Sequence, residues 1–189
     1  MEPDDTGEFA ARLDAARTGD ELAWRWLFRL VSGRVVGFLV VRGAPDPEAV
    51  AGDTFLDIVR SIKRFRGDER AFVSWCLTIA HRRLVDAFRA ASRRPETPTA
   101  PGDLDEPARE DVEETALGLV GAARVRHLLD RLTPDQANVL ALRIYGEMTL
   151  PEVAERLKKP LTAVTSLQHR GLESLRRIIR EEGGGEPTP

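Results

Sequence analysis

The stretch Glu69–Pro95, ERAFVSWCLTIAHRRLVDAFRAASRRP, begins apolar and ends in a run of arginines, although the whole chain carries a formal net charge of -3. Apolar residues recur at steps of three or four, which predicts one amphipathic helix with a core-facing stripe. This stripe contains Val73, Leu77, Ala80, Leu84, Phe88 and Ala91. A second, largely basic line on the same helix contains Trp75, Thr78, Arg82, Asp86, Arg89 and Arg93. The helix is therefore expected to pack on one side and to present arginines on another.

The basic line has two interpretations that this stretch leaves open. It fits a solvated helix face, in which Arg82 and Arg89 bracket Asp86 as intrahelical ion pairs. It equally fits a surface for a polyanion, because guanidinium groups in a row can follow a phosphate backbone and reach base edges. The rest of the chain has to decide between them.

Charge is divided into blocks along the chain. Residues 60–94 hold ten basic and three acidic side chains, and residues 124–180 hold eleven and six. The intervening residues 95–123 hold one basic and eight acidic side chains. Blocks of alternating sign favour two polyanion-facing surfaces joined by an acidic connector.

The predicted architecture is all-α, with two small helical domains joined by an acidic, proline-rich linker. Alternation of apolar and polar residues is scarce, and no Asn-Gly or Asp-Gly hairpin signal occurs. The linker sequence RRPETPTAPGDLDEPAREDVEE is too rich in proline and acids to bury a core. The expected boundaries are residues 7–94 for the first domain, 95–115 for the linker, 116–181 for the second domain and 182–189 for a disordered tail.

Several classes of protein are disfavoured by composition. A single cysteine, Cys76, allows no intramolecular disulfide and fits a reducing compartment. The longest apolar run, near VVGFLVV, is too short to span a membrane, and MEPDDTGEF lacks the apolar core of a secretion signal. The expectation is a cytoplasmic protein without membrane insertion. The three histidines are far apart and no phosphate-binding glycine loop occurs, so we expect no metal, no cofactor and no enzyme activity.

The second domain contains TLPEVAERL, KKPL and TAVTSLQHRGLESL, which have the proportions of a helix-turn-helix. The apolar residues expected to pack this pair together are Val153, Ala154, Leu157, Val164, Leu172, Leu175 and Ile179. Outward residues near the start of the second helix are mostly short hydrogen-bond donors, which suit entry of a helix N-terminus into the major groove. The predicted DNA contacts here are Lys158, Lys159, Thr162, Thr165, Ser166, His169 and Arg170.

These stretches resemble a known family. The bacterial sigma-70 family has a region 4 that resembles LDRLTPDQANVLALRIYGEMTLPEVAERLKKPLTAVTSLQHRGLESLRRII, and a region 2 that resembles DPEAVAGDTFLDIVRSIKRFRGDERAFVSWCLTIAHRRLVDAFRAASRRP. Their order, with an acidic linker between them and no further domain, is similar to the extracytoplasmic-function (ECF) group of two-domain sigma factors. The resemblance covers roughly residues 20–95 and 124–180.

The resemblance implies a sigma factor that binds core RNA polymerase and brings it to promoter DNA. Region 2 of the family docks on the largest polymerase subunit, and it recognises and opens the minus-ten element. Region 4 binds the second-largest subunit and reads the minus-thirty-five element as duplex. Many relatives are held inactive by an anti-sigma factor wedged between the domains, so such a factor is a candidate partner.

The resemblance also implies roles for individual residues. Polymerase docking would fall to the outward charges Asp53, Asp57 and Arg60. The loop 66–70 aligns with the segment that captures a flipped-out base of the non-template strand. The implied minus-ten contacts are Arg66, Arg70, Thr78, Arg82, Arg83, Asp86, Arg89 and Arg93, and the helix-turn-helix residues named above are the implied minus-thirty-five contacts.

The chain also departs from the family pattern. Thr78 and Ile79 stand where primary sigma factors carry a tryptophan pair, which implies weaker melting by wedged aromatic rings and stricter promoter choice. Arg82 stands where the minus-ten helix often has asparagine. Lys158 stands where the turn of region 4 usually has glycine.

Three other readings compete with a sigma factor. A helix-turn-helix regulator that needs no polymerase would use the N-terminal domain to sense a ligand or to dimerise, and would bind promoter DNA without core polymerase. The acidic linker and the arginine-striped helix argue against it. An enzyme lacks a recognisable site, and a purely protein-binding helical module leaves both basic blocks unexplained.

Overall fold

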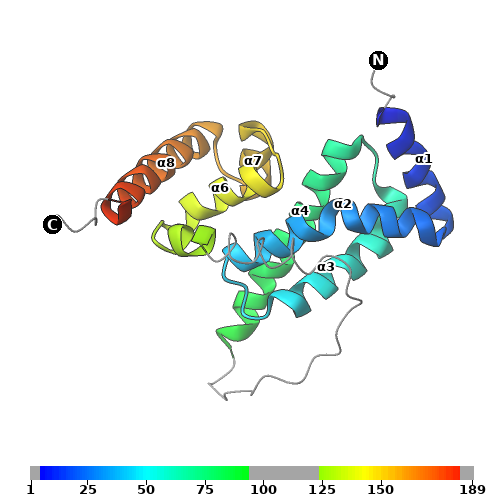
Figure 1. Cartoon of the computed structure of the whole chain (residues 1–189), viewed down its shortest axis with the longest axis horizontal. Helices are drawn as coiled ribbons and strands as arrows, with labels where there is room; N and C mark the ends of the chain where they lie inside the picture. Colours follow the sequence, from blue (N-terminus) through cyan, green and yellow to red (C-terminus); the bar gives the residue numbers. More distant parts are fainter. Residues whose placement is uncertain (1–4, 94–123, 184–189) are drawn as a thin grey trace.

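The computed structural model describes residues 5–93 and 124–183, and every regular element in these residues is a helix (Figure 1). The helices form two groups, one from each half of the chain, which contact each other through α2 and α6. The predicted all-α architecture is confirmed. The predicted linker, residues 95–115, lies outside the described residues. None of the described helices is long and apolar enough to cross a membrane.

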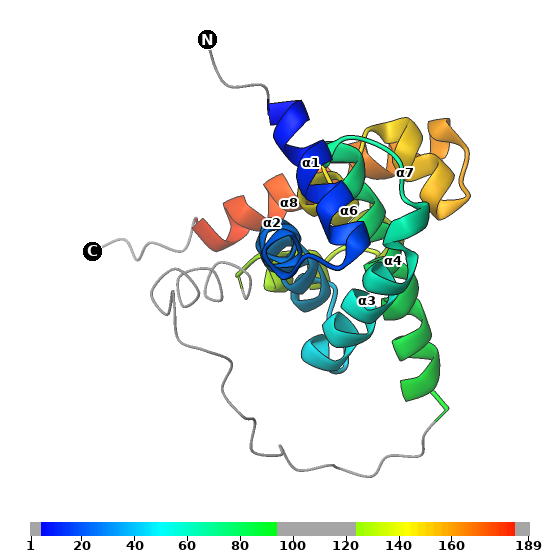
Figure 2. The same cartoon turned by 90° about the vertical axis from the view of Figure 1, so that its right-hand side faces the viewer.

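The N-terminal group is a bundle of four helices. It comprises α1 (Asp5–Thr18), α2 (Glu21–Val41), α3 (Pro47–Ser61) and α4 (Glu69–Ala91), with a short 3-10 turn at Ile62–Arg64. Helix α2 lies centrally and contacts the other three helices (Figure 2). Side chains such as Phe9, Phe38, Phe72 and Leu77 are fully buried where these helices meet, so burial of apolar surface holds the bundle together.

Aspartates begin three of these helices. Asp20, Asp46 and Asp68 each accept a hydrogen bond from the backbone N–H three residues further on, which satisfies a donor that the helix itself leaves free. In α3, Pro47 follows Asp46 at the first helical position, where the fixed φ of proline suits the start of a helix. The N-cap residue Asp68 thus fixes where the loop ends and where α4 begins.

The C-terminal group is built around a helix-turn-helix. Residues 124–130 are helical and are followed by α6 (Pro134–Tyr145), α7 (Leu150–Leu157) and α8 (Leu161–Gly183). Thr133 and Thr149 cap α6 and α7 in capping boxes with Gln136 and Glu152. The short helix, tight turn and long helix predicted from sequence are confirmed in α7 and α8.

Helix α8 packs with a different line of residues from the one predicted. Leu172 and Ile179 are 37% and 50% exposed, so the expectation that they pack inward is wrong. The inward line runs through Val164, Gly171 and Ile178. A Cβ atom on Gly171 would lie 3.1 Å from Leu140 Cδ1, so glycine permits close approach of α8 to α6. The apolar pattern of the sequence does not reveal this inward line, because its central residue, Gly171, has no side chain.

The ends of two helices also differ from expectation. Phe88 and Ala91 continue the predicted apolar stripe of α4 but are exposed, because this end of α4 projects beyond the bundle (Figures 1 and 2). Helix α8 continues through Gly183, into residues that were predicted as tail. The Glu182 carboxylate pairs with Arg124 and Arg131, which holds this last turn. Residues 184–189 lie outside the described residues.

Candidate nucleic-acid interface

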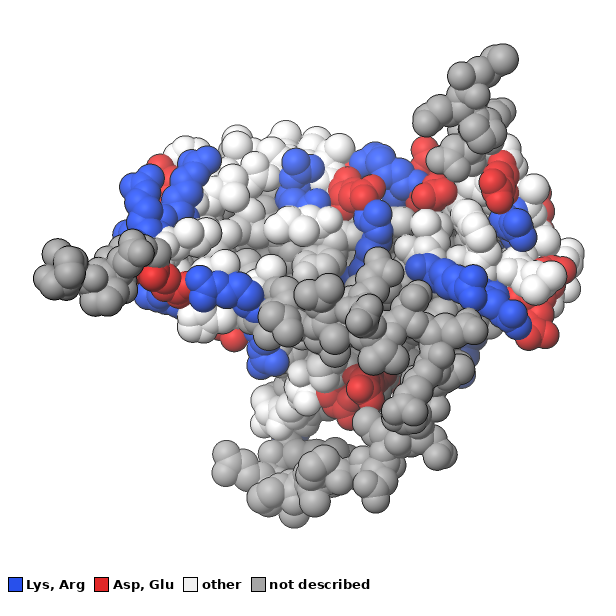
Figure 3. Space-filling view, in the orientation of Figure 1, with Lys and Arg blue, Asp and Glu red and all other residues white. Residues whose placement is uncertain are grey.

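Helix α4 has the two faces predicted from its sequence. Val73, Leu77, Ala80 and Leu84 are buried against the bundle. The predicted polar line is exposed at Arg82, Asp86, Arg89 and Arg93, whereas Arg83 and Thr78 are half-buried. On the face shown in Figure 3, basic side chains lie beside acidic ones at several places instead of forming one continuous positive field. Which cations are free for a ligand therefore depends on their partners.

Arg82 and Arg83 share one carboxylate. The Asp57 carboxylate accepts from Arg82 at 2.9 Å and from Arg83 Nε at 2.7 Å, and its side chain is only 13% exposed. The hydrogen bond from Arg83 lowers the pKa of Asp57, so the carboxylate stays charged. The expectation that Asp57 points outward is wrong, because its side chain is largely buried. Asp57 turns toward α4 because two arginines there compensate its charge.

The loop before α4 has a backbone that only glycine adopts easily. Gly67 has a φ of +145°, and a Cβ atom there would lie 2.8 Å from the Ala71 Cβ atom. Arg66 folds back and donates to the carbonyls of Lys63 and Phe65. Arg70 instead reaches across to the C-terminal group and pairs with Glu152 at 2.9 Å. The two arginines predicted to flank a captured base thus hold different partners.

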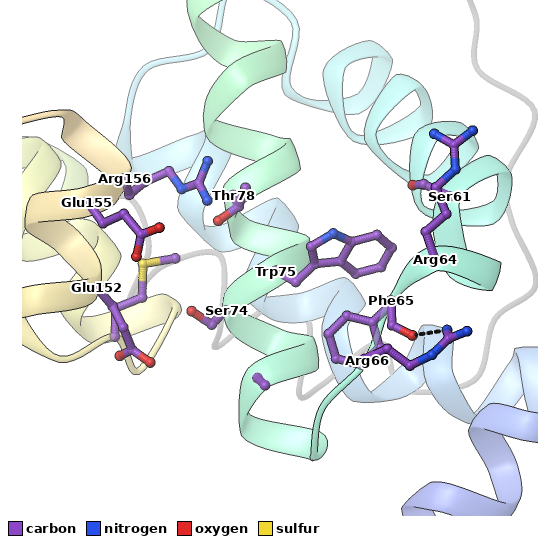
Figure 4. Close-up of a pocket in the computed structure, with 12 residues that line it drawn as sticks. Ser61, Arg64, Phe65, Arg66, Ser74, Trp75, Thr78, Glu152, Glu155 and Arg156 are labelled. Atoms are coloured by element: carbon purple, nitrogen blue, oxygen red, sulfur yellow. Dashed lines mark hydrogen bonds between the residues drawn. The ribbon is translucent and has the colours of Figure 1, made fainter.

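A cavity of about 600 Å³ lies beside this loop (Figure 4). Trp75 and Thr78 from α4 line it on one side, and Arg64 lines it from the 3-10 turn. The Trp75 ring packs on Phe65 and Phe72 at centroid distances of 5.1 and 5.7 Å, so it forms the border of the core. Glu155 and Arg156 of α7 face the same cavity. The cavity is therefore shared by both halves of the chain.

The opposite end of the α4 polar line has few internal partners. Arg89 makes a 3.5 Å contact with Asp86, a pair within one helix that is more than half exposed on both sides. Such a pair contributes little to stability. Arg93 is exposed just after the last turn of the helix. These cations are more available to a polyanion than Arg82 and Arg83.

The start of α8 presents the predicted recognition side chains to solvent. Thr165 and Ser166 donate to carbonyls of their own helix, and Arg170 does the same through Nε. His169 makes a 3.4 Å contact with Glu173 one turn later. Thr162 is also exposed. These partners are local, so each side chain can turn to a ligand without disturbing the packing of the domain.

The two lysines of the turn have different environments. Lys158 is exposed and adopts a left-handed conformation, with φ 52° and ψ 43°, at the end of α7. This is the conformation that favours glycine, which explains why glycine usually occupies this place. Lys159 is half-buried and pairs with Asp135 at 2.9 Å. Lys159 is thus tied to the start of α6, whereas the Lys158 ammonium is exposed beside the recognition helix.

His81 lies on α4 and is half-buried. Burial, together with the nearby charges of Arg42 and Arg156, lowers the pKa of His81 to about 4, so the ring is neutral near pH 7. Its Nδ1 atom is buried without a hydrogen-bond partner in the described protein, while the ring meets Phe38 edge-on. In residues 5–93 and 124–183, no cluster of His, Cys, Asp or Glu could hold a metal ion.

The two helical groups coincide with two sequence families. Residues 22–94 match the family described as Sigma-70 region 2, and residues 128–177 match Sigma-70, region 4. The chain belongs to the sigma-70 family. Helices α2, α3 and α4 accordingly form region 2, whereas α6, α7 and α8 form region 4.

Curated relatives refine this family assignment. The chain is 29% identical over 164 residues to the ECF RNA polymerase sigma factor SigK of Mycobacterium tuberculosis strain H37Rv. This match covers 85% of this chain and 87% of the relative. The protein of the same name from Mycobacterium ulcerans is 28% identical over 181 residues, covering 94% and 96%. With both regions present in order, these relatives place the chain in the ECF group.

A solved structure shares the fold of this sigma-70 chain. It is that of CnrH in complex with the cytosolic domain of CnrY, and it matches with a TM-score of 0.62 at 20% identity. The match covers 94% of this chain and 99% of that chain. The likeness shows a common arrangement of helices.

Region 2 also carries an apolar surface that sequence reasoning missed. Phe28, Leu56 and Val59 are 50%, 53% and 52% exposed, and the Phe28 ring packs in a tilted arrangement on Phe55, with ring centroids 4.7 Å apart. Asp53 and Arg60 of α3 are exposed on the same helix. The sequence contained a signal for this surface, because Leu56 and Val59 are apolar, lie three residues apart and are not among the buried positions of α3.

Proposed function

We propose that this chain is an ECF sigma factor that binds core RNA polymerase and directs promoter-specific initiation of transcription. The observation that carries the proposal is the presence, in one chain, of sigma-70 regions 2 and 4 with separate exposed polar surfaces on α4 and α8. A single chain with two such surfaces can contact two promoter elements, whereas a regulator with one helix-turn-helix contacts one site per domain. The proposed role involves no catalysis by this chain, and its place is the cytoplasm.

Region 2 would recognise the minus-ten element along α4. Arg89 and Arg93 are exposed with little competition, so they suit contacts to phosphate. Arg82 and Arg83 would contact DNA while they share Asp57, which limits their motion and orients them. Arg66 and Arg70 flank Gly67 in the loop proposed to hold the extruded base, and Thr78 and Asp86 complete the polar line.

Region 4 would read the minus-thirty-five element with the start of α8. Thr165, Ser166, His169 and Arg170 lie on its open face, and Thr162 lies one turn earlier. Because their present hydrogen bonds are within the helix, they can be exchanged for bonds to bases and phosphates. Lys158 would contact phosphate from the turn, and Lys159 would do so on leaving Asp135.

Core polymerase would dock on the outer surface of α2 and α3. This surface combines the exposed charges Asp53 and Arg60 with the apolar side chains Phe28, Leu56 and Val59. An apolar centre with polar neighbours is the usual anatomy of a stable protein interface. Asp57 would support the surface from inside through its ion pairs with α4. An anti-sigma factor is a further proposed partner that would compete for these surfaces.

Run-off transcription tests the proposal. Purified chain and core polymerase are incubated with promoter fragments selected from genomic DNA, and co-purification with core polymerase is measured in parallel. We expect promoter-specific transcripts that require the chain. If the chain neither co-purifies with core polymerase nor gives specific transcripts, the proposal is wrong. Tight binding to promoter DNA without polymerase would favour the simpler regulator.

Two arginine variants separate DNA contact from folding. Arg89→Ala removes an exposed cation of the α4 line and should weaken open-complex formation while core binding is retained. Arg12→Ala is the matched control, because Arg12 is partly exposed and also forms an intrahelical pair, but it lies on α1. Equal loss of core binding and open complex in Arg89→Ala would mean that the arginine serves folding.

A further inference from the structure

Arg17 joins α1 to the loop that precedes α4. Its Nη2 group donates a hydrogen bond to the Phe65 carbonyl at 2.5 Å, although the two residues are 48 positions apart in the sequence. Its Nη1 group pairs with Asp14 one turn earlier, and the side chain is only 21% exposed. Because the match to Sigma-70 region 2 begins at residue 22, this contact comes from a helix that lies before the matched region.

The Phe65 carbonyl also accepts a hydrogen bond from a second guanidinium group. Arg66 Nη1 donates to it at 2.7 Å, as the dashed line in Figure 4 shows, and donates to the Lys63 carbonyl at 2.8 Å. A carbonyl oxygen has two lone pairs, so it can accept from Arg17 and Arg66 at the same time. Phe65 is 6% exposed, and a buried acceptor that loses its donors costs free energy.

The double acceptor has a consequence for Arg66, one of the cations proposed to contact the extruded base. To reach DNA, Arg66 must leave the carbonyls of Phe65 and Lys63. Arg17 remains on the Phe65 carbonyl when Arg66 leaves, so that carbonyl stays paired. With Arg17 removed, departure of Arg66 would take away the second of these two donors, and the exchange would become less favourable.

The aromatic ring of Phe65 links the same residue to the wall of the cavity beside the loop. It lies 5.1 Å from the Trp75 ring and 5.3 Å from the Phe72 ring, and Phe72 in turn lies 5.7 Å from Phe9 of α1. Phe65, Arg66 and Trp75 line the cavity (Figure 4). Helix α1 therefore supports Phe65 through its carbonyl and, by way of Phe72, through its ring.

Arginine is a costly residue at position 17 if it serves packing alone. Its Nε atom is buried and has no hydrogen-bond partner among the described residues, which costs free energy. An apolar side chain would pack α1 against the loop without that cost. What arginine adds is a long side chain that donates to the Phe65 carbonyl while Asp14 holds its other end.

We propose that Arg17 of α1 is a positioning residue for minus-ten recognition, which fixes the Phe65 carbonyl and thereby leaves Arg66 free to turn to DNA. The inference rests on the proposed function for the role of the loop. The hold of Arg17 on the loop is measurable on the chain alone, so the two can fail separately.

Hydrogen exchange of the free chain tests the hold on the loop. The amides of Phe65 and Ala71 are hydrogen-bonded at the two ends of the loop, and they should exchange about fivefold faster in Arg17→Ala. Arg12→Ala, on the same helix, is the control and should leave both rates unchanged. Arg17→Lys should recover part of the protection, because an ammonium group also donates. Unchanged rates, or equal acceleration throughout α3, would overturn the proposal.

The effect on Arg66 is tested with polymerase holoenzyme and a single-stranded oligonucleotide. The probe carries the non-template minus-ten sequence of a promoter obtained in the run-off experiment. Arg66→Ala should weaken binding about fivefold in the wild-type background but less than about twofold in the Arg17→Ala background, because Arg66 is then retained by the Phe65 carbonyl. In the Arg12→Ala background, Arg66→Ala should keep its full effect. Core binding should be the same in all variants.

Independent effects of Arg17→Ala and Arg66→Ala on oligonucleotide binding would overturn the proposal, since a purely structural arginine weakens binding equally in both backgrounds. Failure of the wild-type chain to bind core polymerase or promoter DNA would instead count against the proposed function. In that case hydrogen exchange still decides whether Arg17 holds the loop, because that measurement requires no partner.

Discussion

Regions 2 and 4 hold the side chains that we propose to contact DNA in different ways. In region 2, Arg82 and Arg83 share Asp57, and Arg70 pairs with a residue of the other region. In region 4, Thr165 and Arg170 bond only to carbonyls of their own helix. Region 4 could therefore meet duplex DNA almost without rearrangement. In region 2, Arg70 would first have to leave Glu152, and Arg82 and Arg83 remain tied to Asp57.

This difference fits the tasks proposed for the two regions. Reading a duplex requires a preformed helix that enters a groove. Opening a duplex requires side chains that bind only when bases are exposed, and internal pairs keep such side chains from binding intact DNA indiscriminately.

The positions of the tryptophans allow the stability of one region to be measured separately. Trp24, Trp26 and Trp75 all lie in region 2, so tryptophan fluorescence reports the unfolding of that region.

The largest effect is expected from the loop that precedes α4. Gly67→Ala should lower the stability of region 2 by about 3 kcal/mol, because alanine is strained at a φ of +145° and its Cβ atom would collide with Ala71. Gly52→Ala, in open space on α3, is the control and should be neutral or slightly stabilising. Urea unfolding followed by tryptophan fluorescence measures both. Equal stability of the two variants would contradict the argument that this loop requires glycine at position 67.

The next effect is a loss of region 2 stability in mild acid. An unfolded histidine takes up a proton near pH 6.5, whereas folded His81 does so only near pH 4. Stability is therefore complete above pH 6.5, falls as the pH drops, and stops falling below pH 4. Between pH 7 and pH 5 the loss should be about 2 kcal/mol. The fluorescence-detected unfolding of wild type and His81→Leu at both pH values checks this, and an unchanged loss in the variant would contradict it.

A smaller effect tests the carboxylate shared by the α4 arginines. Asp57→Asn should destabilise region 2 by about 1–2 kcal/mol, because Arg82 and Arg83 lose the charge that compensates them. Asp53→Asn on the exposed face of the same helix should change stability by no more than about 0.5 kcal/mol. If thermal unfolding gave the same value for both, Asp57 would be an ordinary surface residue and the contrast between the regions would weaken.

The smallest effect has the opposite sign and belongs to region 4. Lys158→Gly should stabilise this region by about 0.5–1 kcal/mol, because glycine adopts the left-handed conformation without cost. Lys158→Ala removes the same charge but keeps the Cβ atom, so it should bring no gain. Hydrogen exchange of α7 and α8 measures the difference. A gain in both variants would point to charge instead of backbone strain.

Sequence patterns predicted the local features well. Asp46-Pro47, Thr133-Pro134 and Thr149 begin helices because capping depends on residues within one turn. The polar line of α4 also follows from the helical period alone. The misjudged side chains are those whose environment depends on a neighbouring helix. Leu172 and Ile179 are exposed because Gly171 brings a different face of α8 against α6.

By itself, the sequence determined that the chain is helical, where most helices begin, which faces are apolar, and its resemblance to two sigma-70 regions. These properties depend on spacing and on residues close together in the chain. Only the tertiary structure decided which charges are free, because ion pairs such as Asp57 with Arg83 and Arg70 with Glu152 join residues far apart in sequence. The helical period puts an arginine on a face, but only folding decides which carboxylate it meets there.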